Sequence, residues 1–255
     1  MRGGQRFILG SASSVGANRA ECGCEPWREF RHAPEATAPI GAAKKDDGEQ
    51  PALAAPFRDL AHSGALSSSD HRTALRRAVF LDRDGTLNAE RNYLSDPAEL
   101  ELLPGVPDAL KRLQDTGFLL FVVTNQSGIG RGYFTEADLH AVNARLVEWL
   151  SAAGIHFERI YFAPEAPDQP SRGRKPSPQF LFDARDEFGL DLARSYMIGD
   201  KLADLECGWN AGVKASVLVR TGYGRELEAR EPAAVARAWV VDDLAGAARL
   251  ILGDA

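Results

Sequence analysis

The feature that most constrains this chain is a short apolar run that ends in two acids, Val79-Phe80-Leu81-Asp82-Arg83-Asp84-Gly85. A continuous apolar run is typical of a strand buried in a parallel sheet, and ligands bind beyond the carboxyl ends of such strands. Alternation along an extended backbone predicts Asp82 and Asp84 on the same side. Two like charges so close are unfavourable without a cation, and Mg²⁺ prefers oxygen ligands. The alternative is a turn that the acids merely cap.

Apolar runs and helical patterns alternate along the rest of the chain. Strands are predicted over residues 78–81, 118–123, 157–162, 196–198, 215–220 and 239–241. Helices are predicted over residues 106–115, 135–153, 177–188 and 202–209, and after Asp242. This alternation predicts an α/β fold, with a doubly wound, mostly parallel sheet and helices on both faces. The longest excursions, residues 88–103 and 163–174, are too short to form a second domain over the site.

The first 77 residues differ from the remainder in composition. They are rich in Ala, Gly, Ser and Pro and show no sustained periodicity. Such a segment cannot bury enough apolar area to offset the entropy of ordering it. We therefore expect residues 1–77 to be a disordered N-terminal extension and residues 78–255 to be the structured domain.

Charge and cysteine content narrow the range of partners. Residues 78–255 carry 27 acidic and 19 basic residues, a formal charge of −8, which argues against a nucleic-acid surface. Three cysteines in no disulfide pattern favour free thiols in a reducing compartment. No apolar run approaches about 18 residues, so no membrane span is predicted. The expectation is a cytoplasmic monomer.

Polar residues of complementary type follow three further predicted strands. Thr124 follows the second strand, the segment 174–176 (Arg-Lys-Pro) follows the third, and Asp200 follows the fourth, with Asp204 one turn later. Each alone has a structural alternative: a turn residue, a solvated lysine or a strand-exit turn. Together they supply what phosphomonoester hydrolysis needs, namely an attacking oxygen, charge neutralisation and a proton donor.

The stretch 80–88 resembles the first motif of the haloacid dehalogenase (HAD) superfamily of phosphohydrolases. In that superfamily the first Asp is the nucleophile and the second is the general acid/base. The resemblance implies that Asp82 attacks phosphorus to form an aspartyl-phosphate, and that Asp84 protonates the leaving oxygen. It also implies Mg²⁺ as cofactor, held by Asp82, by Asp200 and by the backbone carbonyl of Asp84.

The same resemblance assigns roles to the other strand-end residues. The Thr124 hydroxyl and the Lys175 ammonium would bind and neutralise the phosphoryl group as catalytic residues. Asp204 would orient either a metal-bound water or Lys201.

Four longer segments carry a narrower resemblance, residues 80–88, 124–134, 174–178 and 197–204. They are similar to the D-glycero-D-manno-heptose 1,7-bisphosphate 7-phosphatases and to the histidinol-phosphatases, both capless members of the superfamily. The resemblance covers residues 78–250 and implies removal of the 7-phosphate from a small phosphorylated sugar. It also implies a set of substrate-binding residues: Asn125, Gln126, Ser127, Arg174 and Lys201.

One departure from the resembled family concerns a structural zinc. Family members bind it with a Cys-x-His pair and a Cys-x-Cys pair before the Arg-Lys-Pro segment. Here these places read Ala-Pro-Glu at 163–165 and Ser-Arg-Gly at 171–173. Without thiolate or imidazole a tetrahedral zinc site cannot form there, so no zinc is expected.

Three other functions remain open. The substrate could be histidinol phosphate or another small sugar phosphate. Residues 124–132 also resemble the matching loop of polynucleotide 3′-phosphatases, which act on DNA ends. A non-catalytic phospho-ligand binder is disfavoured because no catalytic position is missing.

Overall fold

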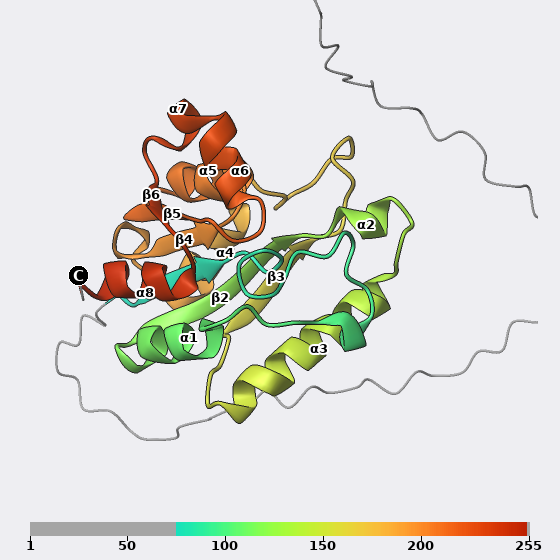
Figure 1. The fold of residues 1–255 in the computed structure, drawn as a ribbon, viewed down its shortest axis with the longest axis horizontal. Coiled ribbons are helices and arrows are strands. Elements are labelled where there is room, and N and C mark those ends of the chain that lie inside the picture. The colour runs from blue at the N-terminus through green and yellow to red at the C-terminus, as the bar shows by residue number, and fades with distance from the viewer. Residues whose placement is uncertain (1–74, 254–255) are drawn as a thin grey trace, which may run out of the picture. The chain divides into compact units, whose positions relative to one another are not determined.

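The computed structural model describes residues 75–253 (Figure 1). The predicted disorder of residues 1–77 therefore falls almost wholly outside the described residues and stays a prediction. The first strand of the described chain, β1, begins at Arg77; the predicted domain boundary also stays a prediction.

The described chain is built on one six-stranded sheet in which every neighbouring pair is parallel. The strand order is β3-β2-β1-β4-β5-β6. The strands are β1 (Arg77–Leu81), β2 (Phe118–Asn125), β3 (Arg159–Ala163), β4 (Tyr196–Gly199), β5 (Ala215–Val219) and β6 (Trp239–Val241). The order reverses beside β1, which is where doubly wound sheets bind ligands.

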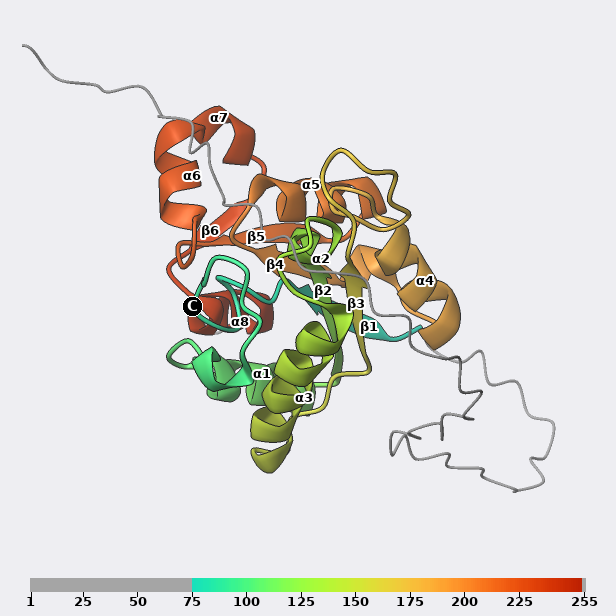
Figure 2. The same cartoon turned by 90° about the vertical axis from the view of Figure 1, so that its right-hand side faces the viewer.

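Helices cover both faces of the sheet (Figure 2). On one face lie α1 (Val106–Asp115), α3 (Glu136–Ala152) and α8 (Leu244–Leu252). On the other lie α4 (Gln179–Phe188) and α5 (Leu202–Ala211). The shorter elements are α2 (Ser127–Gly130), α6 (Gly224–Arg230), α7 (Pro232–Val235) and the 3₁₀ turns η1 (Pro97–Glu99) and η2 (Leu192–Arg194). The predicted doubly wound α/β fold is confirmed.

Residues 78–81 of strand β1 are completely buried because both faces of the sheet are covered. Val79 and Leu81 pack into the cluster under α1, α3 and α8, whereas Ala78 and Phe80 pack into the cluster under α4 and α5. Burial of each large side chain contributes about 1.5–3 kcal/mol. A strand held on both faces and by two parallel neighbours is a rigid support for whatever follows Leu81.

Several boundaries differ from the predicted ones for local reasons. Strand β2 continues through Thr124 and Asn125 because both residues pair with β3, and the predicted loop after it contains the short helix α2. Helix α4 begins at Gln179, two residues late, because Ser177 closes a turn onto Arg174. Neither long excursion becomes a separate domain within residues 75–253.

Helix α3 has a well-defined N-terminal cap at Thr135. The Thr135 hydroxyl accepts from the Asp138 backbone N–H, and the Asp138 carboxylate accepts from the Thr135 backbone N–H. This reciprocal arrangement is a capping box. No helix in the described part of the chain is long and apolar enough to cross a bilayer.

Candidate active site

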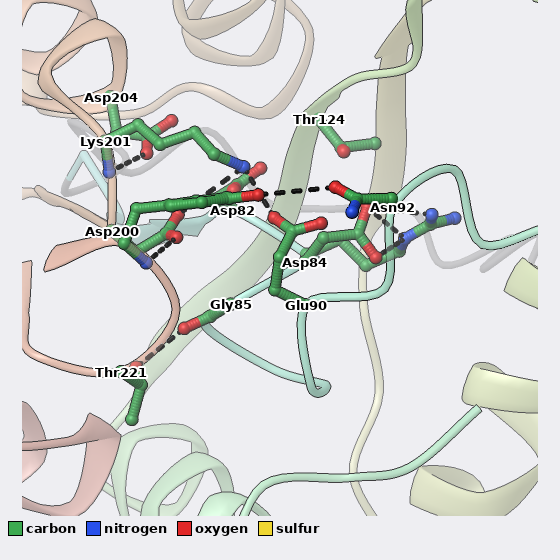
Figure 3. Close-up of polar contacts among 12 residues, drawn as sticks. Asp82, Asp84, Gly85, Glu90, Asn92, Thr124, Asp200, Lys201, Asp204 and Thr221 are labelled. Carbon is green, nitrogen blue, oxygen red and sulfur yellow. Dashed lines mark hydrogen bonds and ion pairs between the residues drawn. The ribbon is translucent and has the colours of Figure 1, made fainter. Parts of the chain in front are cut away.

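Predicted site residues from three strand ends, Asp82, Thr124 and Asp200, meet at the carboxyl edge of the sheet, where β1, β2 and β4 end (Figure 3). Asp82 directly follows β1, Thr124 is the last residue but one of β2, and Asp200 directly follows β4. Parallel pairing puts these three strand ends at one edge of the sheet. Thr124 and Asp200 therefore lie beside Asp82, although they are 42 and 118 positions further along the chain.

Three buried carboxylates form the floor of the site. Asp82, Asp200 and Asp204 each supply an oxygen within 4.8 Å of the other two. Their side chains are almost inaccessible to solvent. Ionised carboxylates that are this close together and shielded from water are strongly unfavourable unless cations compensate their charge.

Lys175 provides one of the compensating charges. Its Nζ lies 2.7 Å from Asp82 Oδ1 and 2.6 Å from Asp204 Oδ1, and it donates to the Val123 carbonyl at 2.6 Å. Burial alone would lower the pKa of Lys175, but Asp204 and Asp82 outweigh it and raise that pKa above its ordinary value. Lys175 is therefore a fixed ammonium beside the carboxylate that the sequence predicts as nucleophile.

Asp200 is the carboxylate that most needs a further cation. Its Oδ2 accepts from the Tyr223 backbone N–H at 2.8 Å, whereas its buried Oδ1 has no hydrogen-bond partner among the described residues. The closest recorded cation, Lys201 Nζ, lies 3.9 Å from Oδ1. Burial and the Asp82 carboxylate raise the pKa of Asp200 to about 8. A hard divalent cation fits this donor set, because it would stabilise the ionised carboxylate and use the unpartnered oxygen.

The Asp84 carboxylate is held apart from this cluster by its own set of donors. It accepts from Arg83 Nη2 at 2.8 Å, from Asn88 Nδ2 at 2.9 Å and from Gln126 Nε2 at 2.9 Å. Burial would raise the pKa of Asp84, but Arg83, Asn88 and Gln126 together lower it. The β1 strand ends at Leu81, so strand alternation does not govern where Asp84 points.

Arg83 is a site residue that the sequence analysis did not identify. Its side chain is completely buried, and its guanidinium joins Asp84 to Asn143 Oδ1 of α3 at 2.9 Å. A fully buried arginine between two candidate catalytic acids is unusual. Its position in the motif, next to each acid, was the only signal available in the sequence.

Thr124 and Gln126 belong to one hydrogen-bonded chain. Gln126 Nε2 donates to Thr124 Oγ1 at 2.8 Å and to Asp84 Oδ2 at 2.9 Å. The amide thereby occupies an acceptor site of the Thr124 hydroxyl, whose proton remains available for an acceptor in the site. Gln126 is therefore in direct contact with two of the predicted catalytic groups.

Asn125 has a clear structural partner. Its Nδ2 donates to the Lys175 carbonyl at 3.0 Å, and its Oδ1 accepts from the Lys175 backbone N–H at 2.9 Å. This two-way amide pair fixes the backbone that carries the buried ammonium. Its predicted role in binding substrate stays a prediction, although Asn125 also lines the cavity described below.

Asp204 has two partners, Lys201, which the sequence analysis had named, and Lys175, which it had not. Its Oδ2 accepts from the backbone N–H of Lys201 at 2.9 Å, and its Oδ1 pairs with Lys175. The Lys201 side chain instead pairs with Glu90 Oε2 at 2.8 Å and lies 5.0 Å from the centre of the Tyr223 ring. Burial raises the pKa of Glu90 despite this pairing.

The loop before Lys175 is held by hydrogen bonds. Ser171 Oγ donates to Glu165 Oε2 at 2.7 Å and accepts from the Arg174 backbone N–H at 3.1 Å. The Arg174 side chain, half-buried, donates to the Glu165 carbonyl at 3.1 Å. Its predicted contact with substrate is untested, and it does not appear among the residues lining the cavity next to Asp84.

A cavity of about 210 Å³ opens beside Asp84. Its walls come from the excursion after β1, from the end of β2 and the start of α2, and from the loops after β4 and β5. The lining residues are Asp84, Glu90, Arg91, Asn92, Tyr93, Leu94, Asn125, Gln126, Ser127, Gly128, Lys201 and Tyr223. Most of them carry hydrogen-bonding groups, which suits a polar, many-hydroxyl ligand.

The fold and this arrangement of acids around a buried lysine define the chain as a phosphomonoesterase of the HAD-like hydrolases. The HAD-hydrolase-like family model matches residues 173–247.

Individual relatives narrow the class. The Escherichia coli and Haemophilus ducreyi proteins named D-glycero-beta-D-manno-heptose-1,7-bisphosphate 7-phosphatase are each 42% identical to this chain. The matches cover 66% of this chain and 90% of the E. coli protein, and 62% of this chain and 91% of the H. ducreyi protein. The chain belongs to this D-glycero-D-manno-heptose-1,7-bisphosphate 7-phosphatase family.

Two solved structures of phosphatases with this name resemble the chain in sequence and fold. The D,D-heptose 1,7-bisphosphate phosphatase of B. bronchiseptica, crystallised with magnesium and phosphate, is 34% identical with a TM-score of 0.64. The superposition covers 70% of this chain and 99% of that one. A phosphatase of the same name from Burkholderia thailandensis is 31% identical with a TM-score of 0.53, over 69% and 99% of the two chains.

Proposed function

We propose that this chain is a Mg²⁺-dependent phosphatase that removes the 7-phosphate of D-glycero-D-manno-heptose 1,7-bisphosphate through an aspartyl-phosphate on Asp82. The observation that carries the proposal is the buried cluster of Asp82, Asp200 and Asp204, compensated on one side by Lys175. The names of the relatives support the choice of sugar.

The proposed metal site uses groups already described. Asp82, Asp200 and the backbone carbonyl of Asp84 would hold Mg²⁺, which when bound supplies charge neutralisation for an anionic substrate. The Lys175 ammonium also contributes a positive charge to the site, and it donates to Asp82 Oδ1 at 2.7 Å. Asp82 Oδ2 is then the oxygen left to attack phosphorus.

The proposed chemistry has two balanced steps. Asp82 Oδ2 bonds to phosphorus while the bond from phosphorus to the sugar oxygen breaks, and Asp84 gives that oxygen a proton. A water molecule then attacks phosphorus, Asp84 takes its proton, and the bond from phosphorus to Asp82 breaks to release phosphate. Asp84 is poised as an anion in the free site, and an adjacent phosphoryl group would favour its protonated form.

Side chains around the cavity would orient the substrate. Thr124 would donate its hydroxyl proton to a phosphoryl oxygen, while Gln126 aligns Thr124 with Asp84. We propose Asn125, Ser127 and Lys201 on the cavity wall as contacts for the sugar. Arg174 would approach the distal phosphate.

The direct test is a phosphate-release screen with and without Mg²⁺. The substrates are the heptose bisphosphate, histidinol phosphate, other sugar phosphates and 3′-phosphorylated DNA. We expect the heptose bisphosphate to have the highest kcat/KM and EDTA to abolish turnover. A preference for another substrate would refute the assignment of the sugar.

The nucleophile is tested by Asp82→Asn, with Asp138→Asn at the cap of α3 as a remote control. We expect Asp82→Asn to lose turnover while its circular dichroism spectrum stays that of the parent protein. Retained turnover would remove Asp82 as nucleophile. Elemental analysis of the purified protein tests the expected lack of zinc, since stoichiometric zinc would contradict it.

A further inference from the structure

The turn after β5, residues 221–223, lies against the acids of the site although the sequence analysis gave it no role. We propose that this turn is a positioning element that fixes the Asp200 carboxylate in the orientation required to bind Mg²⁺. The inference rests on the proposed function, because it concerns the same metal site.

Two hydrogen bonds join the turn to the site (Figure 3). The Tyr223 backbone N–H donates to Asp200 Oδ2 at 2.8 Å, and Thr221 Oγ1 donates to the Gly85 carbonyl at 2.6 Å. The first bond restrains the carboxylate, and the second holds the turn against the segment that follows Asp84. One short turn thereby couples the ends of β1 and β4.

Two glycines enclose the Asp200 carboxylate, and we call the space between them the glycine slot. Gly85 and Gly222 both have positive φ, 85° and 52°. A Cβ on Gly222 would lie 2.1 Å from Asp200 Oδ2, and a Cβ on Gly85 would lie 2.4 Å from the same oxygen. Any larger residue at either position would have to displace the carboxylate or the backbone.

The glycine slot and the Tyr223 N–H both act on one oxygen of the carboxylate. Oδ2 is packed and hydrogen-bonded, whereas Oδ1 is buried without a hydrogen-bond partner among residues 75–253. With one oxygen fixed, the carboxylate cannot rotate to find another partner for Oδ1. The turn therefore keeps an oxygen available for a cation, and such outer contacts commonly govern metal affinity by about 10–100-fold.

The experiment measures Mg²⁺ binding directly, without substrate, by isothermal titration calorimetry on the full chain. Gly222→Ala fills the slot, and Gly189→Ala is the matched control. Gly189 also has positive φ, 64°, but a Cβ there would meet nothing within 4 Å in the described chain. We expect the Kd for Mg²⁺ to rise about 10–100-fold in Gly222→Ala and to stay unchanged in Gly189→Ala.

Thr221→Val provides a second, milder variant that keeps the shape of the side chain and removes its hydrogen bond to Gly85. We expect its Kd for Mg²⁺ to rise at least about threefold, with kcat at saturating Mg²⁺ affected much less than the Mg²⁺ concentration for half-maximal activity. This split distinguishes positioning of the metal site from general damage.

The outcomes separate the two proposals. Parent-like Mg²⁺ binding in Gly222→Ala, or an equal loss in Gly189→Ala, would overturn the role of the turn. If Gly222→Ala does not fold, parent-like binding in Thr221→Val would overturn it. If the parent protein itself neither binds Mg²⁺ nor needs it to release phosphate, the proposed function fails, and this inference with it.

Discussion

Replacing Lys175 by Met leaves two buried carboxylates without their shared cation. Lys175 is 4% exposed, and its Nζ lies 2.7 Å from Asp82 and 2.6 Å from Asp204. Removing one partner from a buried ion pair costs about 3–5 kcal/mol, because the remaining charge stays buried. We expect the free energy of unfolding to fall by that amount and Tm to fall by roughly 6–20 °C for a domain of this size.

The assay is urea unfolding at pH 7.5 without divalent cations, followed by circular dichroism. Lys111→Met is the control, because Lys111 is paired with Asp115 at the surface, where such a pair contributes little. Adding Asp204→Asn to Lys175→Met removes one of the two uncompensated charges. We expect this double variant to recover part of the lost stability while phosphatase activity stays absent.

The result that would refute this reasoning is a loss below about 1 kcal/mol in Lys175→Met, comparable to that of an exposed pair. Such a loss would mean that water or a proton compensates Asp82 and Asp204 once Lys175 is gone. A double variant less stable than Lys175→Met would also contradict the account, because the destabilisation would then not come from unpaired carboxylates.

Three further predictions follow from the described contacts. Thr135→Ala, at the cap of α3, should lower the free energy of unfolding by about 1 kcal/mol in urea, and no loss would contradict the capping box. Arg83→Met should raise the pKa of Asp84 and move the alkaline limb of the kcat/KM profile to higher pH, because Asp84 must be protonated to act as the general acid, so an unmoved limb would count against this contact. The pKa of Asp200 is raised to about 8, so the folded metal-free protein holds a proton on Asp200 at pH 6. The free energy of unfolding of the metal-free protein should therefore fall as the pH rises toward 8. The gain in Tm from Mg²⁺ should therefore be larger at pH 8.5 than at pH 6, and an equal or opposite gain would refute it.

The buried strands were predictable because each is a continuous apolar run. Strand β1 lies on both hydrophobic clusters of the sheet, so almost every residue before Asp82 has to be apolar. The carboxyl ends of parallel strands share one edge, so the residues that follow the runs at Asp82, Thr124 and Asp200 could be expected to meet. Lys175 could be expected there as well, because the Arg-Lys-Pro segment follows the third predicted strand.

Other parts of the site could not be derived from a single sequence. The partners of Arg83 and Tyr223 are set by three-dimensional pairing, with Asn143 and Asp200 far away along the chain. Gly222 looks like any turn glycine until the carboxylate beside it is seen. The separation of Asp84 from the acid cluster depends on where β1 ends, and strand ends are hard to place by pattern.

The central position of β1 has a consequence for how the protein is made. Its register with β4 pairs Phe80 with Met197, and the loop after β5 must also be in place to hold Asp200. Forming such distant pairings closes a long loop of chain and is intrinsically slow. A nascent chain that has not yet emerged from the ribosome as far as Tyr223 lacks a part of the pocket, so any phosphatase activity should arise only late in synthesis.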